Sequence, residues 1–129
     1  RKVETMIILK ISMNVMFEKQ KELAQTLLSM MESMENAEGC LSCTLYCDIE
    51  DKSLLLLLEE WRTRKDLDLH LRSEIFGVLL GTKSLLNEPH RLDIYTCRQS
   101  EGEEAVLVAR EKNAISRQKL ADDASRNKY

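Results

Sequence analysis

Proline and glycine are scarce in this sequence, with one proline and four glycines among 129 residues. Collagen-like and low-complexity chains need far more of both, so neither class fits. Hydrophobic residues make up 43% of the chain, which is too large a share for a mostly disordered protein. The length therefore predicts one folded domain that is large enough to bury a core of its own.

Long hydrophobic runs are also missing. The longest one, residues 54–58, has five residues, whereas a membrane-spanning helix needs about 20. Near the amino terminus only residues 6–9 are consecutively apolar, and this is too short for the core of a secretory signal peptide. We therefore expect no contact with a membrane and a cytoplasmic location.

Basic clusters and aromatic residues are few. The chain carries 22 acidic and 19 basic residues, aromatic residues make up 5%, and the single compact basic group lies at residues 62–65. Nucleic-acid sites need grouped lysines and arginines, often with aromatic rings on which bases stack. The sequence therefore predicts no nucleic-acid partner.

Three of the four cysteines, Cys40, Cys43 and Cys47, lie close together in the sequence. This spacing could hold a metal or a disulfide if the segment were a loop, but residues 40–47 are rich in strand-forming residues. Strand alternation would place Cys40 on one face and the other two on the opposite face. Cys43 and Cys47 would then lie about 13 Å apart. We expect no metal site here, and reduced, packed thiols.

The hydrophobic pattern predicts six elements in the order strand, helix, strand, strand, helix, strand. Strands are expected at residues 5–13, 40–47, 53–61 and 90–98. The first helix, at 17–34, should follow an amino-terminal cap at Asn14 and bury one face. That face contains Leu23, Ala24, Leu27, Leu28, Met31 and Met34. The second helix should begin at Thr63 and break at Ser73, because a continuous helix would turn Glu74 inward and Phe76 outward.

This order predicts an α+β fold of the ferredoxin-like βαββαβ type with an antiparallel sheet. The predicted domain occupies residues 5–98. Residues 99–129 form a separate carboxy-terminal extension that is expected to be helical, because Ser100 and Glu103 resemble a capping box ahead of an alanine-rich stretch.

The predicted sheet is apolar on both faces, since residues 54–58 and 6–9 do not alternate with polar residues. Helices can cover one face only, and the other would expose an apolar patch that monomers rarely tolerate. We therefore predict a homodimer in which two sheets pack face to face. The alternative is that residues 101–129 fold back over the open face.

Three short motifs complete the pattern: Gly39-Cys40 at the start of a strand, Glu59-x-Trp61 at the end of the next, and His70-Leu71-x-Ser73-x-x-Phe76 on the following helix. Together they resemble the antibiotic biosynthesis monooxygenase (ABM) family. The resemblance covers about residues 5–98 and implies a dimeric α/β barrel.

The resemblance also implies an activity. The family includes cofactor-independent monooxygenases that act on quinols and polycyclic aromatic molecules. Such chemistry needs a base, polar contacts to oxygen atoms and an apolar wall. His70 is the candidate base, since imidazole titrates near neutrality, and Glu59 would orient it or a substrate hydroxyl. Trp61 would line the pocket. The remaining substrate-binding candidates are Tyr46, Asn14 and Phe76.

Other interpretations remain open. His70 and Trp61 could be packing residues, and Glu59 could begin a solvated turn. The same cavity could belong to a non-catalytic small-molecule binding or accessory protein, or to an isomerase-type enzyme that moves a proton with His70. Haem is not expected, because residues 76–81 lack the histidine that ligates it in the haem-degrading branch and His70 is retained. We predict no cofactor.

Overall fold

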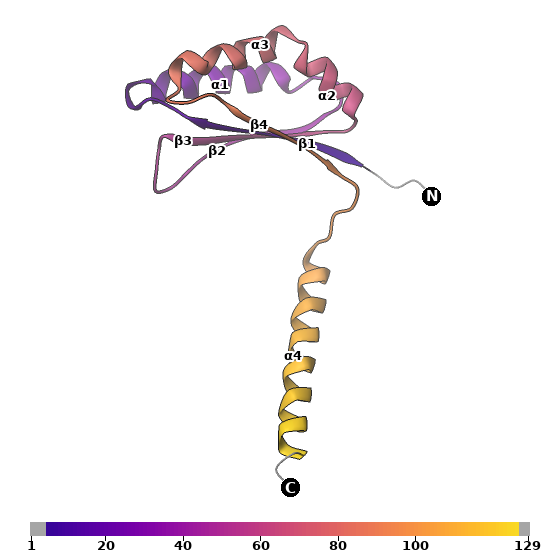
Figure 1. Ribbon diagram of the computed structural model, residues 1–129. Coiled ribbons are helices and arrows are strands. Elements are labelled where there is room, and N and C mark those ends of the chain that lie inside the picture. Colours follow the sequence, from indigo (N-terminus) through magenta and orange to yellow (C-terminus); the bar gives the residue numbers. More distant parts are fainter. Residues whose placement is uncertain (1–4, 127–129) are drawn as a thin grey trace. The chain divides into compact units, whose positions relative to one another are not determined.

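The computed structural model describes residues 5–126. The predicted order of strands and helices is confirmed (Figure 1). The contacts divide the chain into two units, one ending at Arg98 and one beginning at Gln99. The elements are β1 (Met6–Asn14), a short 3-10 turn (Phe17–Lys19), α1 (Gln20–Met34), β2 (Cys40–Cys47), β3 (Leu54–Trp61), α2 (Arg64–Leu71), α3 (Glu74–Gly81), a second 3-10 turn (Thr82–Leu85), β4 (Arg91–Cys97) and α4 (Glu103–Arg126).

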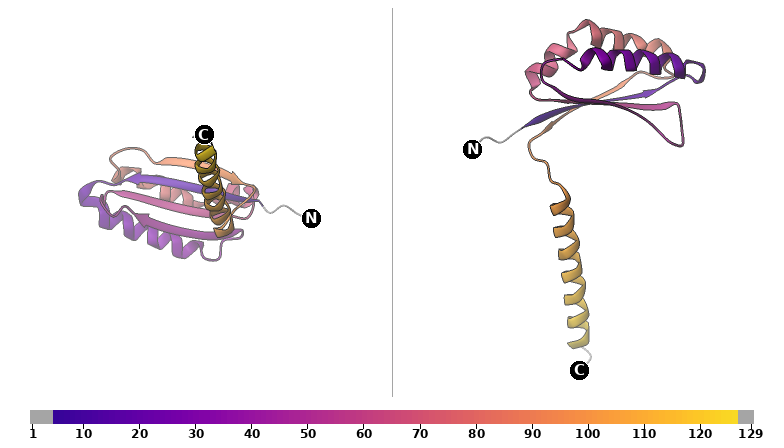
Figure 2. Two further views of the ribbon diagram at one scale, coloured as in Figure 1. Left: turned by 90° about the horizontal axis from the view of Figure 1, so that it is seen from below. Right: turned by 180° about the vertical axis from the view of Figure 1, so that it is seen from behind.

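The four strands form one antiparallel sheet in the order β2-β3-β1-β4. Helices α1, α2 and α3 lie on the same face of this sheet, and the two further views in Figure 2 show the same layering. This is the ferredoxin-like α+β fold. The sheet stays open, because β2 and β4 are its edges and do not pair with each other.

The core lies between the sheet and the helices, and strand alternation fills it. Every second residue of β1 is buried, and β3 follows the same rule from Leu55 onward. The other face of the sheet has no helix of this unit over it and carries half-buried and exposed apolar side chains. These are Met6, Ile8, Tyr46, Leu54, Leu56, Leu58 and Tyr95.

Helix α1 differs from the prediction in two ways. Its buried face consists of Leu23, Leu27, Met30 and Met34, so the predicted burial of Leu28 is wrong and that side chain is 56% exposed. A single helix packing on a sheet buries a narrower stripe than the six predicted positions would cover.

The predicted helix cap at Asn14 is also wrong. Asn14 is the last residue of β1, and its side-chain amide carbonyl accepts a 3.0 Å hydrogen bond from Asn87. The following residues first make a bridge to Leu86 and then the 3-10 turn, so the helix begins six residues later. Asn14 therefore connects the end of β1 by a hydrogen bond to the segment before β4.

A β-bulge between Cys40 and Ser42 changes the faces of β2. Cys40 lies opposite Trp61, and Cys43 lies opposite Glu59, so both point to the helix-covered face. The predicted separation of Cys40 from Cys43 and Cys47 on opposite faces is therefore wrong, because the bulge adds one residue to the alternation. Cys40, Cys43 and Cys47 are free thiols.

Gly39 precedes β2 in a left-handed conformation, with φ of +80°. Its carbonyl oxygen accepts a 2.8 Å hydrogen bond from the Arg62 amide. A Cβ atom at this position would overlap the side chain of Asp66 on α2. The backbone at Gly39 thus lets the start of β2 approach the first turn of α2.

The unit that begins at Gln99 contains the helix α4. Its apolar residues are distributed around the helix rather than along one face, and Val106, Leu107 and Val108 are each at least half exposed. Across residues 5–126, no helix combines the length and apolar character that a bilayer span requires.

Candidate functional site

An acid occupies a core position on β3. The inward-facing residues of this strand are Leu55, Leu57, Glu59 and Trp61, and Glu59 is fully buried. Trp61 lies two residues further on the same face, and its indole Nε1 donates a 2.9 Å hydrogen bond to Glu59 Oε1. The prediction placed Glu59 either in a site or in a solvated turn, and burial removes the second option.

His70 reaches the same acid from α2. Thr63 caps this helix by accepting a hydrogen bond from the Asp66 amide, as the capping-box pattern predicted. His70 then falls in the last turn, where its Nε2 lies 3.2 Å from Glu59 Oε1 and its side chain is 4% exposed. A buried acid and a buried imidazole thus face each other between the helix layer and the sheet.

Ser73 joins α2 to α3 and fixes the geometry around His70. Its hydroxyl donates a 2.6 Å hydrogen bond to the His70 carbonyl oxygen and accepts one from the Phe76 amide. The predicted break at Ser73 is confirmed. Because the chain turns here, Phe76 points back toward His70, and their ring centres are 5.4 Å apart in an edge-to-face contact.

We call Glu59, Trp61, His70 and Phe76 the inner cluster. The imidazole of His70 stacks on the Trp61 ring, with centroids 4.7 Å apart and an interplanar angle of 28°. The hydrogen bonds of the cluster are nevertheless incomplete. Glu59 Oε2 has no partner, and the His70 Nε2 contact with Glu59 does not meet hydrogen-bond geometry despite its short distance. Buried polar atoms without partners are rare, and they mark places where a further donor or acceptor fits.

Two thiols of β2 border the inner cluster. Cys43 lies directly opposite Glu59, and Cys40 lies opposite Trp61. Burial, and secondarily the nearby Glu59 carboxylate, raise the pKa of Cys43 to about 12. The same two causes raise the pKa of Cys40. Sequence reasoning treated these cysteines as packing, because the cross-strand register that brings them to Glu59 cannot be read from spacing alone.

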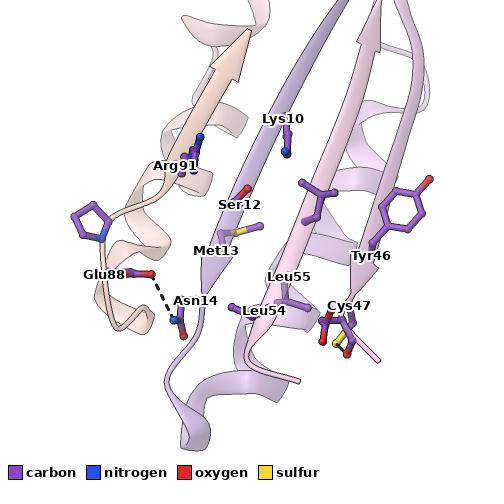
Figure 3. Close-up of a pocket in the computed structure, with 13 residues that line it drawn as sticks. Lys10, Ser12, Met13, Asn14, Tyr46, Cys47, Leu54, Leu55, Glu88 and Arg91 are labelled. Carbon is purple, nitrogen blue, oxygen red and sulfur yellow. Dashed lines mark hydrogen bonds between the residues drawn. The ribbon is translucent and has the colours of Figure 1, made fainter. Parts of the chain in front are cut away.

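Tyr46 and Asn14 do not belong to the inner cluster. Both lie beside a hollow on the open face of the sheet, with a volume of about 620 Å³. Figure 3 shows Lys10, Ser12 and Asn14 along β1, with Tyr46 on β2 and Arg91 on β4. The sequence-predicted site is thus divided between the two faces of the sheet.

The open-face hollow combines apolar and charged side chains. Leu54, Leu56, Lys10 and Arg91 all line it. Glu88 accepts a 3.5 Å hydrogen bond from Asn14 (Figure 3). Sequence reasoning missed Lys10 and Arg91, since single basic residues on two strands far apart in the sequence form no recognisable motif.

The hollows described along the chain do not include the inner cluster in their linings. Of four hollows along residues 10–112, none is lined by Glu59, Trp61, His70 or Phe76. Among the residues that the structure describes, there is also no group of three or more His, Cys, Asp or Glu side chains able to hold a metal ion. In this conformation the arrangement places a buried acid beside a buried imidazole, and a substrate would need room to enter.

The sequence profile of the antibiotic biosynthesis monooxygenase family matches residues 6–80. This match spans more than half of the chain and includes the strands and helices that carry the inner cluster. The chain therefore belongs to the ABM family. Among curated proteins, none matches the chain by sequence.

Solved structures support the fold assignment. A conserved protein from Methanosarcina mazei is 26% identical with a TM-score of 0.66, and the match covers 72% of this chain and 92% of that one. A protein from Nitrosomonas europaea, provisionally named an antibiotic biosynthesis monooxygenase, is 17% identical with a TM-score of 0.69 and coverages of 79% and 99%. A Deinococcus radiodurans protein with the same provisional name is 19% identical, with a TM-score of 0.63 and coverages of 74% and 94%.

Proposed function

We propose that the chain is a cofactor-independent monooxygenase that acts on a phenolic or quinol molecule at the inner cluster. Family membership supports the reaction class. The observation that carries the proposal is the buried pair of Glu59 and His70, in which Glu59 Oε2 and His70 Nε2 lack well-formed hydrogen bonds. A phenolic hydroxyl could supply the missing donor and lose its proton to His70.

The proposed reaction draws its electrons from the substrate. Once the hydroxyl is deprotonated, the electron-rich ring reduces O₂, and one oxygen atom becomes bonded to a ring carbon that carries a hydrogen. This carbon is opposite the hydroxyl in a phenol and beside a hydroxyl in a quinol. That carbon loses its hydrogen, the ring becomes a quinone, and the second oxygen atom leaves as water. Trp61 and Phe76 would keep bulk water from the reacting ring.

Oxygen consumption with a panel of phenols and quinols tests this proposal. The wild-type chain should consume one O₂ per quinone formed, and His70→Ala should lose at least about 100-fold in rate, the scale of general-base catalysis. Glu59→Gln should lose less, because the amide still accepts the Trp61 hydrogen bond. If no phenol or quinol supports oxygen consumption, the proposal is wrong.

A second candidate is a non-catalytic small-molecule binding or accessory protein. The open-face hollow favours it, because this hollow is accessible whereas the inner cluster is closed. Tyr46, Lys10 and Arg91 would hold an aromatic molecule with an acidic group. Calorimetric titration with aromatic acids distinguishes the two: binding that Lys10→Ala weakens and His70→Ala leaves unchanged would favour this candidate.

Isomerase-type proton transfer is the third candidate, and it uses the same His70 and Glu59. It predicts exchange of a substrate C–H for deuterium in D₂O without any oxygen consumption. Nuclear magnetic resonance of the phenol panel under argon would detect that exchange.

We also propose that two copies of the chain pack sheet to sheet, which would complete a dimeric α/β barrel. The apolar open face supports this, since Tyr46, Leu54 and Tyr95 are each more than 40% exposed. A second copy would cover part of the open-face hollow. The free thiols of β2 support a reducing compartment, the cytoplasm.

A further inference from the structure

A second hollow, of about 390 Å³, lies between α1 and the edge strand β2. Leu28, Met31 and Met34 of α1 form its apolar side, and Cys40 and Cys43 line it from β2. Methionine and cysteine side chains are soft and adaptable, so such a lining can accommodate flat apolar molecules of different outlines.

The floor of this hollow is one side chain away from the inner cluster. In the strand register Cys43 is opposite Glu59 and Cys40 is opposite Trp61, all on the helix-covered face. Directly opposite residues on neighbouring strands have Cβ atoms about 5 Å apart. The two thiols therefore lie between the hollow and the acid and indole.

The two thiols between the hollow and the inner cluster are small and, because of the β-bulge, both lie on the helix-covered face. Without the extra residue at Leu41, alternation would turn Cys40 to the open face. β2 is also an edge strand, hydrogen-bonded to β3 alone, so it can shift outward without breaking a second ladder. The Cys40 and Cys43 side chains, which move with β2, can then shift aside while the rest of the sheet stays paired.

The charges at the hollow select the ligand. Glu32 of α1 and Glu35, the residue that follows this helix, also line it, and carboxylates disfavour an approaching anion. Inside, Glu59 Oε2 is buried and lacks a hydrogen-bond donor. A neutral molecule with an apolar ring and a hydroxyl group satisfies both conditions, whereas an aromatic acid satisfies neither.

We propose that neutral phenols reach Glu59 and His70 through the hollow between α1 and β2, passing between Cys40 and Cys43. This inference rests on the proposed function for its destination, but it concerns binding and can be tested without turnover. Cys40 and Cys43 act as access residues, and neither takes part in the chemistry.

Trp61 gives a direct readout, because it is the one tryptophan of the chain and it belongs to the inner cluster. Under argon, 1-naphthol should quench Trp61 fluorescence, and 1-naphthoic acid should not. Cys43→Leu fills the passage with a residue that suits a strand and should weaken 1-naphthol binding at least tenfold. Cys47→Leu, on the same strand but beside the open-face hollow, should leave the affinity unchanged.

A reversible block guards against misfolding of the Leu variant. In a chain carrying Cys47→Ala and Cys97→Ala, methyl methanethiosulfonate should cap Cys40 and Cys43, abolish 1-naphthol quenching, and release it again on reduction. The inference is overturned if wild-type Trp61 does not respond to 1-naphthol, or if capping and Cys43→Leu leave binding intact. Binding by this route without oxygen consumption would retain the inference and refute the proposed oxygenase. Oxygen consumption that Cys43→Leu does not change would instead refute the inference and retain the proposed oxygenase.

Discussion

Gly39 carries a constraint that its position in a Gly-Cys motif does not reveal. The residue adopts a positive φ, and any Cβ would meet the Asp66 side chain, which also accepts a hydrogen bond from Thr63. Two separate penalties therefore act on substitution: the left-handed backbone, which costs about 1 kcal/mol, and steric overlap with the first turn of α2.

Gly39→Ala should lower the free energy of unfolding by about 2–3 kcal/mol, combining the backbone cost with overpacking. Urea denaturation followed by circular dichroism measures it. Gly77→Ala is the matched control, since it lies inside α3 with no atom near the added methyl group, and it should raise stability by about 0.5–1 kcal/mol. Equal effects at both positions would contradict the role assigned to Gly39.

Cys43 makes the free energy of unfolding depend on pH in the alkaline range. Burial raises the pKa of its thiol to about 12 from a reference value of 9.0, so the folded chain holds this proton more tightly than the unfolded chain does. The resulting stabilisation is complete below pH 9 and is lost as the pH rises from 9 toward 12.

Cys43→Ala should flatten the decline of the unfolding free energy above pH 9 relative to wild type. Because Cys43 is partly accessible, the difference will be smaller than full burial would give. Cys47→Ala is the control for the same chemistry at an exposed position. Parallel stability profiles for wild type and Cys43→Ala between pH 8 and 11 would disprove this assignment.

At the scale of elements, the junction between α2 and α3 positions half of the inner cluster. Ser73 ends one helix and caps the next, and through these two bonds it relates His70 to Phe76. The junction is short, so a change in its geometry moves the imidazole relative to Glu59.

Ser73→Ala should cost about 1 kcal/mol of stability, the usual value of a helix cap. It should also reduce any His70-dependent oxygen consumption several-fold, since the imidazole loses its positioning. Ser84→Ala removes only a long 3.4 Å bond in the second 3-10 turn and should change neither. A Ser73→Ala chain with the stability of wild type would show that the backbone holds the junction unaided.

The elements also show what sequence could predict. The helix break at Ser73 can be predicted because a continuous helix would bury Glu74 and expose Phe76. This argument uses only residues close together in the sequence, so it does not depend on how the strands pair. The face of Cys40 was predicted wrongly, because a bulge is set by how two strands pair and leaves no mark in the alternation of one. Asn14 and Tyr46 were grouped with His70 for a related reason, since only the register shows that they lie on the other face.

At the scale of the whole molecule, the proposed dimer depends on the open face of the sheet. Leu58 lies near the centre of that face, paired with Lys10 on one side and Thr44 on the other. In a sheet-to-sheet dimer it would be buried among apolar neighbours, where a charge without a partner is costly.

Leu58→Glu should therefore weaken dimerisation at least about 30-fold, as expected for a central interface position. Light scattering should give a mass near twice 14.9 kDa for wild type and near 14.9 kDa for the variant at low micromolar concentration. Leu80→Glu, on an exposed site of α3, is the control. A chain ending at Ser100 should remain dimeric, and a monomeric wild type would refute the proposed assembly.

The placement of Glu59 raises the question of why the core contains an acid and an imidazole. Glu59 is an acid among the leucines of β3, and the side chain that faces it is an imidazole rather than a lysine or an arginine. This contact departs from the apolar pattern of an otherwise consistent core. Apolar residues of similar volume would satisfy this layer at least as well. Stability alone would not favour such a pair, so its presence within a well-packed core points to a requirement other than folding.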